Sequence, residues 1–595
     1  MADRLFATEA LGVKWSEFKA EGFQSPAPGI IYKSGESECG LPLGGIGTGC
    51  MDLDTDGTFG RCSIFNSFAP PRVLNAPFLG LTLGNQVYCL STRPLRGTKP
   101  AMQIHYWGHF PIADLEYEVD ASISVGVRTW CPFAPGDANI SNTPAICFEV
   151  RVRNLAHQAV NGSIVMSFPG PNSEESGATS STHKAVGHRI KGICVRGGGT
   201  DYTLAVVGED EPRLGGVLAK EGDWIRLPAG LPISDGADPG SSIAVDFAIA
   251  PAQEKKISLV LAWYAPRWVG SPAHHYWHAY HKRFHDSSEV AEFLAQNKDD
   301  VLTRILRWQA AIYNLSDLPV WLRDQLVNTL HTITEGSLWA SDSIPKEDWY
   351  GPTGLFGMIE SPRTTPHICN PSDWYGGLPI VFFFPELAAT LLRSYLHFQL
   401  PNGEIPLGIG EGADLAHPVY HLIHTLNSCV HIHLIDRLWQ RDGRVEVLRE
   451  FYPSARSALA YMKGFDRVTD AGILNAARQD GSPDRTAPPQ SDGIFTGEAL
   501  CVTATMAYFG QTKAAVHIAE NLFNAIVLRD RREWDMPNIL DAAGIAIHGT
   551  DFYQTMMLWA LPLALRAQSL QEACCQGELI DQVIRAASAK AHSNV

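Results

Sequence analysis

Two carboxylates and two aromatic residues lie close together in residues 357–379. Glu360 stands near the start of this stretch, and Asp373, Trp374 and Tyr375 follow after a run broken by prolines, just before an apolar segment. The stretch is too polar for a protein core and too aromatic for a plain linker, so it indicates the floor of a pocket. The alternative is a surface loop whose acidic residues are incidental.

Paired carboxyl groups are what the cleavage of an acetal needs. One group protonates the departing oxygen, and the other either attacks the anomeric carbon or activates a water molecule. Glu360 is one candidate for this pair. The second should lie on another loop that faces the same pocket, and residues 479–493 offer Asp480, Asp484 and Asp492 just before a predicted helix. An ordinary loop is again the alternative.

A glycine-rich run at residues 44–49 has the composition of a phosphate-binding loop. Such a loop works by directing backbone N–H groups and a helix N-terminus at an anion. Here residues 50–59 are typical of a strand, a turn and a second strand instead. We therefore expect these glycines to allow close approach of backbones within a sheet.

Histidines form two groups that could suggest a metal site. One group comprises His417, His421, His424, His431 and His433, and the other comprises His274, His275, His278, His281 and His285. Zinc sites need three or four converging ligands and a second shell around them. We find no carboxylate or cysteine spaced to complete such a site, so we expect capping, packing and polar contacts. We predict no metal ligand and no cofactor.

Residues 27–265 are rich in glycine, proline and short alternating runs, which indicates antiparallel sheets. Residues 143–153 alternate clearly, so we expect Ile146 and its alternate neighbours to be buried. We expect the other face, with Cys147 and Glu149, to lie in water. Further strands are predicted at residues 162–168, 243–250 and 257–263, and repeated strands of this kind suggest a large β-sandwich.

From about residue 274, apolar residues recur at three- and four-residue spacing, which predicts helices. These are expected at residues 287–312, 318–339, 378–398, 418–440, 445–463, 496–509, 513–527, 552–567 and 577–591. Helical hairpins joined at one end by long loops can close into a toroid around a central pocket, although this number falls short of a full double ring of twelve. We predict a β-sandwich domain at 1–270, linker helices at 271–315 and a catalytic helical domain at 316–595.

Composition limits the partners. The 595 residues include 45% hydrophobic and 18% charged residues, which suits large buried cores. The net charge of −16 argues against nucleic acid or an anionic membrane as the main partner. We find no apolar run long enough for a secretory signal or a transmembrane helix, so we expect a cytoplasmic protein. The twelve scattered cysteines are interpreted as buried thiols.

Three separated stretches of the sequence resemble glycoside hydrolase family 116, the family of the non-lysosomal β-glucosylceramidase. They are residues 40–49 with 56–59, Glu360 with residues 370–375 and 384–387, and residues 470–475 leading into 480–486. The first resembles the glycine-rich opening of the family's N-terminal β-sandwich. The second is similar to the nucleophile loop with the proline-containing helix behind it, and the third to the acid/base loop. They follow one another in the family's order.

The resemblance implies a β-sandwich packed on an (α/α)6 barrel and an exo-acting hydrolase that retains the anomeric configuration. It implies that Glu360 is the nucleophile and Asp484 the acid/base, with Asp373 nearby to orient groups or bind substrate. Four extra residues separate Thr486 from Asp492, so Asp492 is the reserve acid/base candidate. The family's calcium-associated aspartates are only partly kept near residues 465–470, which leaves a structural calcium open.

Departures from the family bear on the substrate, which we expect to be a carbohydrate. Leu407 stands where glucose-specific relatives have a sugar-contacting histidine, Gln554 stands in place of an arginine, and another arginine falls near His548. Losing such donors would leave glucose hydroxyls unpaired, at a cost of ~1–3 kcal/mol per group. The family also includes β-xylosidases and enzymes that remove α-D-arabinofuranosyl units. Candidate substrate-binding residues are Asp373, Trp374, Tyr375, Asp480, Asp492, His548 and Gln554.

Two other functions stay open from the sequence. A carbohydrate-binding or scaffold protein could keep this fold without the chemistry, and an inverting glycosidase could use the same toroid. Experiment can distinguish both alternatives from a retaining glycosidase. A carbohydrate-binding protein would hydrolyse no 1,2-trans glycoside. An inverting enzyme would hold its acids roughly 6.5–9.5 Å apart instead of roughly 5–5.5 Å. The sugar, the linkage, the aglycone and the oligomeric state are left open.

Overall fold

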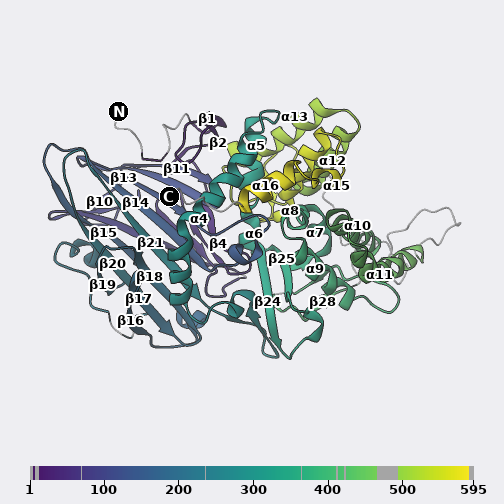
Figure 1. The fold of residues 1–595 in the computed structure, drawn as a ribbon, viewed down its shortest axis with the longest axis horizontal. Coiled ribbons are helices and arrows are strands. Elements are labelled where there is room, and N and C mark those ends of the chain that lie inside the picture. The colour runs from purple at the N-terminus through teal and green to yellow at the C-terminus, as the bar shows by residue number, and fades with distance from the viewer. Residues whose placement is uncertain are drawn as a thin grey trace.

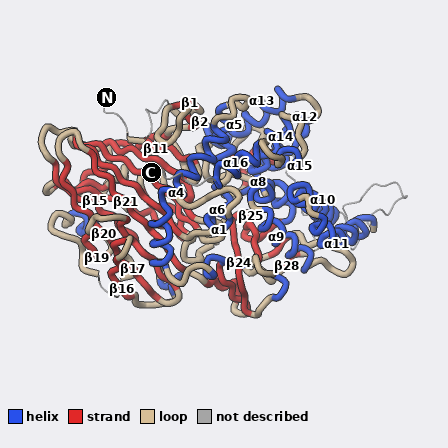
Figure 2. Tube along the Cα trace, viewed as in Figure 1, coloured by secondary structure: helices blue, strands red, loops and turns tan. Residues whose placement is uncertain are grey.

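The computed structural model describes residues 5–6, 12–68, 70–234, 236, 238–363, 365–410, 413–420, 424–464 and 493–588. Strands fill the N-terminal half, and helices gather in the C-terminal half (Figure 1, Figure 2). This division confirms the predicted combination of antiparallel sheets followed by helices. Within these ranges, no helix has both the length and the hydrophobicity needed to cross a membrane.

Two large sheets make up most of the N-terminal half. The larger has the order β16-β17-β18-β21-β14-β13-β12-β11-β3 and is antiparallel throughout. Its strands are β3 (Tyr32–Lys33), β11 (Gln103–His109), β12 (Ile112–Glu118), β13 (Ile123–Trp130), β14 (Ala145–Asn154), β16 (Thr182–Gly187), β17 (Ile190–Gly197), β18 (Thr200–Val207) and β21 (Glu254–Tyr264).

The second large sheet has the order β10-β9-β8-β15-β20-β19. Its strands are β8 (Leu79–Leu83), β9 (Gln86–Cys89), β10 (Lys99–Pro100), β15 (Val160–Phe168), β19 (Pro212–Gly216) and β20 (Ser241–Ile249). Phe168 of β15 packs edge-on against Tyr202 of β18 with ring centroids 5.0 Å apart, and the Tyr202 hydroxyl donates to Ser241. The two sheets therefore share one core.

The alternation in β14 is only partly as expected. Ile146, Phe148 and Val150 are buried as predicted. Cys147 and Glu149, expected in water, are buried as well. The cause is the long helix α4 (Ser287–Tyr313), which crosses this face of the sheet (Figure 1). The alternation does not reveal a distant helix that covers the second face.

A four-stranded sheet contains the glycine-rich run. It is formed by β4 (Leu41–Gly44), β5 (Cys50–Leu53), β6 (Thr58–Cys62) and β7 (Arg72–Pro77). A Cβ atom at Gly44 would lie 2.2 Å from the Gly49 carbonyl oxygen, and Gly47 and Gly49 have φ angles of +64° and +77°. The prediction of close backbone approach is confirmed, since side chains would not fit in this turn.

The predicted helices largely form, with some breaks. They are α5 (Val320–Asn328), α6 (His331–Gly336), α8 (Leu378–Phe383), α9 (Pro385–His397), α10 (His424–Asp442), α11 (Val445–Lys463), α12 (Thr496–Tyr508), α13 (Thr512–Phe523), α14 (Ala560–Leu565), α15 (Leu570–Ala573) and α16 (Leu579–Ser588). The 3₁₀ helix η5 (Tyr553–Trp559) begins the predicted helix at 552–567. Pro385 lacks a backbone N–H, so the predicted helix 378–398 divides there into two.

A sheet that the sequence did not predict lies between the two halves. It has the order β22-β23-β24-β25-β26-β27-β28. Its strands are β22 (Arg267–Ser271), β23 (His274–His278), β24 (Ser337–Ile344), β25 (Leu355–Ser361), β26 (Thr365–Cys369), β27 (Gly408–Ile409) and β28 (Pro418–Val419). The helix predicted at 318–339 was therefore wrong at its end, since pairing with β25 draws residues 337–339 into β24.

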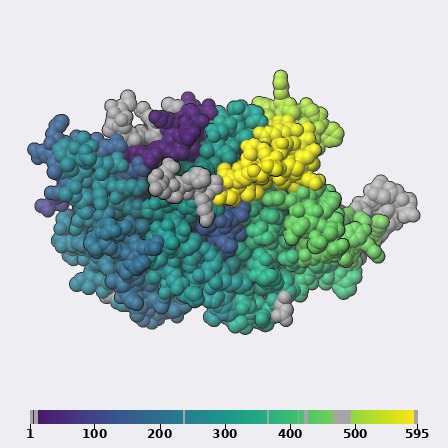
Figure 3. Space-filling model, viewed as in Figure 1, coloured from purple at the N-terminus to yellow at the C-terminus, as the bar shows by residue number. Residues whose placement is uncertain are grey.

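The purple segment near the N-terminus and the yellow C-terminal helices lie along the same edge of the molecule (Figure 3). The C-terminal helix α16 packs against α4, which itself covers the large N-terminal sheet. Arg304 of α4 donates to the Ala587 carbonyl of α16 and pairs with Asp137 at 2.7 Å. These contacts fasten the helical half to the sheets.

Candidate active site

Glu360 lies on strand β25, and the proline-broken loop that the sequence indicated begins only after this strand. Its side chain is buried, with 8% of the residue exposed. The Ser372 hydroxyl donates to Oε1, and Gln554 Nε2 donates to the same oxygen over 3.1 Å. Gln554 also donates to Ser372 over 2.7 Å. Strand β25, helix α7 (Asn370–Gly376) and η5 therefore converge on one carboxylate.

Several groups act on the ionisation of Glu360 in opposite directions. Burial raises the pKa of this carboxyl, and the nearby Glu498 raises it further. Hydrogen bonds from Ser372, Cys369 and Gln554 lower the pKa, because they stabilise the carboxylate. The net pKa lies above the ordinary value of a glutamate. These donors favour an anionic oxygen in a place where burial alone would favour the neutral acid.

Asp373 lies in the first turn of α7 and is also buried. The hydroxyls of Tyr395 and Tyr553 donate to its two oxygens over 2.6 and 2.7 Å. Burial raises the pKa of Asp373 to about 7, the two hydroxyls oppose this shift, and Glu360 adds to it. Asp373 can therefore hold or release a proton near neutral pH, and it directly follows Ser372 in α7.

Trp374 and Tyr375 pack edge-on against each other with ring centroids 4.9 Å apart. Arg437 of α10 lies over the Trp374 ring at 4.6 Å and donates to the Trp374 carbonyl. Tyr375 faces Glu498 of α12, and its hydroxyl lowers the pKa of that carboxyl, which burial raises. Trp374 is thus fixed by a cation on its ring face, while Tyr375 adjoins a second carboxylate.

Gly497 permits this close packing. A Cβ atom there would lie 2.9 Å from the Tyr375 ring and 3.1 Å from Gln554. The absence of a side chain brings α12 against both residues and places Glu498 beside the group around Glu360. Sequence reasoning did not single out Glu498, although it directly follows this glycine near the N-terminus of α12.

Four buried polar atoms around this group have no hydrogen-bond partner within the described ranges. They are Asn370 Nδ2 and Oδ1, Gln554 Oε1 and Glu498 Oε2. Buried polar atoms in folded proteins are nearly always paired with protein or water. Unpaired donors and acceptors gathered near one carboxylate are what a site for a polyhydroxylated ligand would present.

Glu360, His367 and Cys369 place one possible ligand atom each within 4.8 Å of one another. Burial, followed by the charge of Glu360, raises the pKa of the Cys369 thiol well above its ordinary value. Hydrogen bonding from Cys369 in turn lowers the pKa of Glu360. His367 and Cys369 therefore form part of the setting of the Glu360 carboxylate.

The structure does not bring all predicted site residues together. It gathers Glu360, Asp373, Trp374, Tyr375 and Gln554. His548 lies exposed on β31 (Ala546–His548) with its ring 6.1 Å from that of Phe552, and no hydrogen bond within the described ranges joins it to Glu360 or Asp373. Asp480, Asp484 and Asp492 lie outside the described residues.

A wide hollow of the described surface lies on the sheet that contains β15 and β20, away from Glu360. It is lined by residues that include Asn161, Arg213 and Asp246. Arg213 and Asp246 pair with each other there at 2.9 Å. Their charges are thus already matched, so we define the candidate site by the polar partners of Glu360 and not by the size of a hollow.

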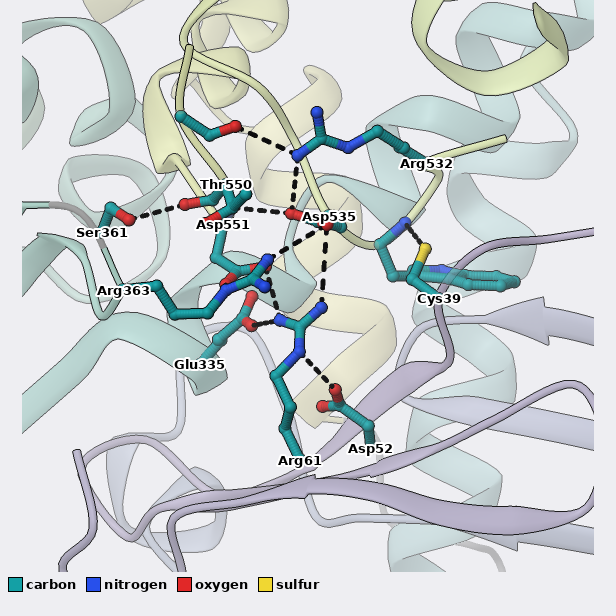
Figure 4. Close-up of polar contacts among 12 residues, drawn as sticks. Cys39, Asp52, Arg61, Glu335, Ser361, Arg363, Arg532, Asp535, Thr550 and Asp551 are labelled. Atoms are coloured by element: carbon teal, nitrogen blue, oxygen red, sulfur yellow. Dashed lines mark hydrogen bonds and ion pairs between the residues drawn. The ribbon is translucent and has the colours of Figure 1, made fainter. Parts of the chain in front are cut away.

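Arg61 joins the N-terminal sheets to the segments that carry the candidate site (Figure 4). Its guanidinium contacts four carboxylates, those of Asp551 at 2.7 Å, Glu335 at 3.5 Å, Asp52 at 3.6 Å and Asp535 at 3.7 Å. Burial raises the pKa of Asp52 to about 7 against the opposing effect of Arg61. One arginine thus offsets much of the repulsion among four buried acids.

The same cluster reaches the turn that follows Glu360. Arg363 donates to Asp551 over 2.8 Å and to Asp535 over 3.1 Å, and the Ser361 hydroxyl donates to the Thr550 carbonyl over 2.6 Å. Residue 551 directly precedes the segment that carries Tyr553 and Gln554. The cluster therefore holds both the strand that bears Glu360 and the helix that bears its partner.

Replacing Arg61 by methionine should cost about 3–5 kcal/mol in the free energy of unfolding, because it leaves the buried carboxylates of Asp52 and Glu335 without their arginine. Asp535 and Asp551 would keep their pairs with Arg363. Arg61 lowers the pKa of Asp52 and of Asp551. Its removal raises these folded-state pKa values, and an acid with a raised folded pKa loses stability as the pH rises. The loss should therefore be larger at pH 8 than at pH 5 in urea unfolding.

Arg93→Met is the control for this prediction. Arg93 pairs with Asp56, but its side chain is 46% exposed. Exposed pairs contribute about 0–1 kcal/mol, so this variant should unfold nearly like the wild type. A loss below about 1 kcal/mol in Arg61→Met, or one that does not change with pH, would contradict a structural role for the cluster.

Comparison with known proteins connects the N-terminal half to a glycosidase family. Residues 40–301 match a family model described as "beta-glucosidase 2, glycosyl-hydrolase family 116 N-term". The resemblance indicated by the sequence is confirmed over these residues, while Glu360 and its partners lie beyond them. A solved structure named provisionally as a kojibiose phosphorylase from the human microbiome is similar, with a TM-score of 0.40 and 9% identity. The similarity covers 72% of this chain and 57% of that one.

Proposed function

Since residues 40–301 match the N-terminal domain model of glycosyl hydrolase family 116, we propose that this chain is a retaining, exo-acting glycosidase. Its C-terminal helices would form the (α/α)6 toroid that the sequence resemblance implies. The proposed domains remain 1–270, 271–315 and 316–595. The substrate would be a 1,2-trans glycoside, either a β-glucoside or β-xyloside or an α-D-arabinofuranoside.

The observation that carries the proposal is the setting of Glu360. This glutamate is buried, receives hydrogen bonds from Ser372 and Gln554, and lies near Glu498. Gln554 Oε1 and Glu498 Oε2 have no hydrogen-bond partner within the described ranges. A purely structural glutamate would instead be expected to have a cationic partner. Within the described ranges no arginine or lysine pairs with Glu360, although His367 Nε2 lies 4.0 Å from Oε2. Ser372 and Gln554 both donate to Oε1, so Oε2 is the oxygen that would meet a ligand.

The proposed reaction uses two carboxyl groups in two steps. Glu360 attacks the anomeric carbon and forms a glycosyl ester, while Asp484 gives its proton to the departing oxygen as the glycosidic bond breaks. Asp484 then takes a proton from water, whose oxygen attacks the same carbon and releases Glu360. Retention follows because the carbon is inverted twice. Asp492 is the alternative acid/base, and Asp480 is a further candidate contact.

Neighbouring residues would support these steps. Asp373, held by Tyr395 and Tyr553, directly follows Ser372 in α7 and would hydrogen-bond the sugar or the acid/base. Tyr375 and Gln554 would contact the sugar, and Trp374 would provide an apolar wall. His548 would act on substrate only from its exposed position on β31.

Ser372→Ala tests how the site keeps Glu360 ionised. Loss of this hydrogen bond removes a group that lowers the pKa of Glu360, so that pKa rises further above its ordinary value. The nucleophile then needs a higher pH to ionise, and the acid limb of the kcat/KM profile should move to higher pH. Below that limb kcat/KM should fall about tenfold, the cost of a hydrogen bond to a charged group.

Ser394→Ala is the matched control, because Ser394 donates only to the Leu391 carbonyl of its own helix. Its pH profile should follow that of the wild type. An unchanged acid limb in Ser372→Ala would show that Glu360 is not the group whose ionisation limits turnover.

A panel of aryl glycosides tests the proposed function. It should include the β-glucoside, β-xyloside, β-galactoside and α-D-arabinofuranoside, with the first-formed product anomer followed by NMR. We expect turnover of at least one substrate with retention of configuration. Inversion would favour an inverting glycosidase, and no hydrolysis of any member would favour a carbohydrate-binding protein.

A further inference from the structure

A second cluster of possible ligand atoms lies away from Glu360, between strand β23 and the segment that enters β28. His274 begins β23, and Asp414 and His417 lie just before β28. Asp414 Oδ2 is 3.1 Å from His274 Nδ1 and 2.9 Å from His417 Nδ1. One ligand atom from each residue lies within 4.8 Å of the others. Sequence spacing did not reveal this set, because 140 residues separate His274 from Asp414.

Asp414 is held in one orientation by its surroundings. The Tyr276 hydroxyl donates to Oδ1 over 2.7 Å, and the backbone N–H of Ala416 donates to the same oxygen over 3.3 Å. Oδ2 is left as the oxygen that faces both imidazoles. Metal-binding carboxylates are typically fixed by second-shell hydrogen bonds of this kind.

The backbone around Asp414 is fixed as well. The Trp268 indole donates to the Ala413 carbonyl over 3.1 Å. A Cβ atom at Gly270 would lie 2.7 Å from the Asp414 Cα, so glycine at this position lets the two segments touch. The carboxylate is therefore placed before any ligand arrives, which lowers the entropy cost of binding.

The distances fit adjacent positions around a divalent metal ion. At a metal distance of about 2.1 Å, two ligands lie about 3.0 Å apart at the right angle of an octahedral site and about 3.4 Å apart at the tetrahedral angle of zinc. The observed nitrogen–oxygen separations of 3.1 and 2.9 Å match the first value, so tetrahedral zinc binding would move the two rings apart by a few tenths of an ångström. The same distances suit N–H···O hydrogen bonds, and Ser271 Oγ lies 3.1 Å from His274 Nδ1 as a further partner. Metal binding would thus replace the hydrogen bonds from the two Nδ1 atoms to Asp414 by bonds from the same three atoms to one metal ion.

We propose that His274, Asp414 and His417 form a binding site for a divalent transition-metal ion of the zinc class. Two imidazoles and one carboxylate suit zinc, nickel or cobalt, whereas calcium and magnesium prefer oxygen ligands alone. His417 is 61% exposed, so water completes the coordination. The site does not depend on the proposed glycosidase activity.

Such an ion would stabilise strands β26–β28, which lie beside the candidate active site. Residues 408–419 contain β27 and β28, and β27 pairs with β26, which carries His367 and Cys369. The backbone N–H of Asn370 also donates to the Leu407 carbonyl over 2.8 Å. A metal bound by Asp414 and His274 would link these strands to the β22–β23 hairpin and stabilise both.

Zinc binding to chelator-treated full-length protein tests the proposal by equilibrium dialysis and thermal unfolding. The wild type should bind one zinc ion at this site and unfold at a higher temperature with zinc than with chelator. His274→Ala and His417→Ala should each lose this ion and the thermal shift. Tyr276→Phe should weaken binding about tenfold or more, as for other second-shell partners.

Two further variants serve as controls. His275→Ala changes the neighbouring residue on β23, whose side chain points to the opposite face of the strand. His367→Ala removes the histidine near Glu360, so it separates this cluster from binding at the candidate active site. Both should keep the ion bound. The proposal would be overturned if the wild type bound zinc no more strongly than His274→Ala and His417→Ala. It would also be overturned if only His367→Ala lost the ion.

Discussion

Glu360→Gln is expected to lower kcat by at least about a thousand-fold on the best substrate of the panel, because the amide cannot form the glycosyl ester. The variant should fold, since glutamine has nearly the same shape and can still accept hydrogen bonds from Ser372 and Gln554. Steady-state kinetics with a thermal unfolding curve for each variant measure both effects.

Glu446→Gln serves as the control, because the Glu446 side chain on α11 is 66% exposed and far from any proposed chemistry. Its kcat should match that of the wild type. In the smaller variant Glu360→Ala, azide should restore turnover by occupying the vacated space and attacking the anomeric carbon directly. The azide product should have the inverted configuration. Near-normal kcat in Glu360→Gln would remove Glu360 from the mechanism.

Asp484→Asn is expected to have the second largest effect, and its size should depend on the leaving group. A general acid accelerates the reaction by about 10²–10⁴-fold. In Asp484→Asn, glycosides with a poor leaving group should therefore react more slowly by about this factor. Aryl glycosides with an acidic phenol need little protonation, and formation of their glycosyl-enzyme should be nearly unaffected. Rates plotted against the leaving-group pKa measure this difference.

Asp492→Asn and Asp480→Asn test the assignment within the same segment. Both should keep a dependence on the leaving group like that of the wild type. If Asp492→Asn shows the steep dependence instead, the acid/base is Asp492. If none of the three variants shows it, the proton comes from another group. Glu498 and Asp373 are the described carboxyls that interact with the charge of Glu360.

The strands and helices that the sequence revealed best have strong local periodicity. The alternation of Ile146, Phe148 and Val150 located β14, and the spacing of apolar residues located α4 and α11 within about a residue. The central sheet was missed because its pairing is interrupted by bulges, two of its strands have only two residues, and its order depends on pairing between distant segments. Glu360 was consequently expected in a loop and lies on β25.

The candidate site shows a similar limit. The acidic and aromatic residues 360–375 stood out by composition, whereas Ser372 and Tyr395 are common residue types whose role depends on their geometry. Tyr553 reaches Asp373 from 180 residues away, which local patterns do not reveal. Gln554 was named only through the family resemblance, and its hydrogen bond to Glu360 spans 194 residues. The Arg61 cluster was missed for the same reason, since its four acids come from distant parts of the chain.

The most direct test of the proposal is to trap the glycosyl-enzyme. The protein is incubated with a fluorosugar that forms the ester quickly and hydrolyses it slowly, chosen for the sugar that the panel identifies. Intact-protein mass spectrometry should show the addition of one glycosyl unit, and peptide mapping should place it on Glu360. Attachment to another residue would contradict the assignment of Glu360 as the nucleophile. So would the absence of any adduct while the enzyme hydrolyses the fluorosugar without being inactivated.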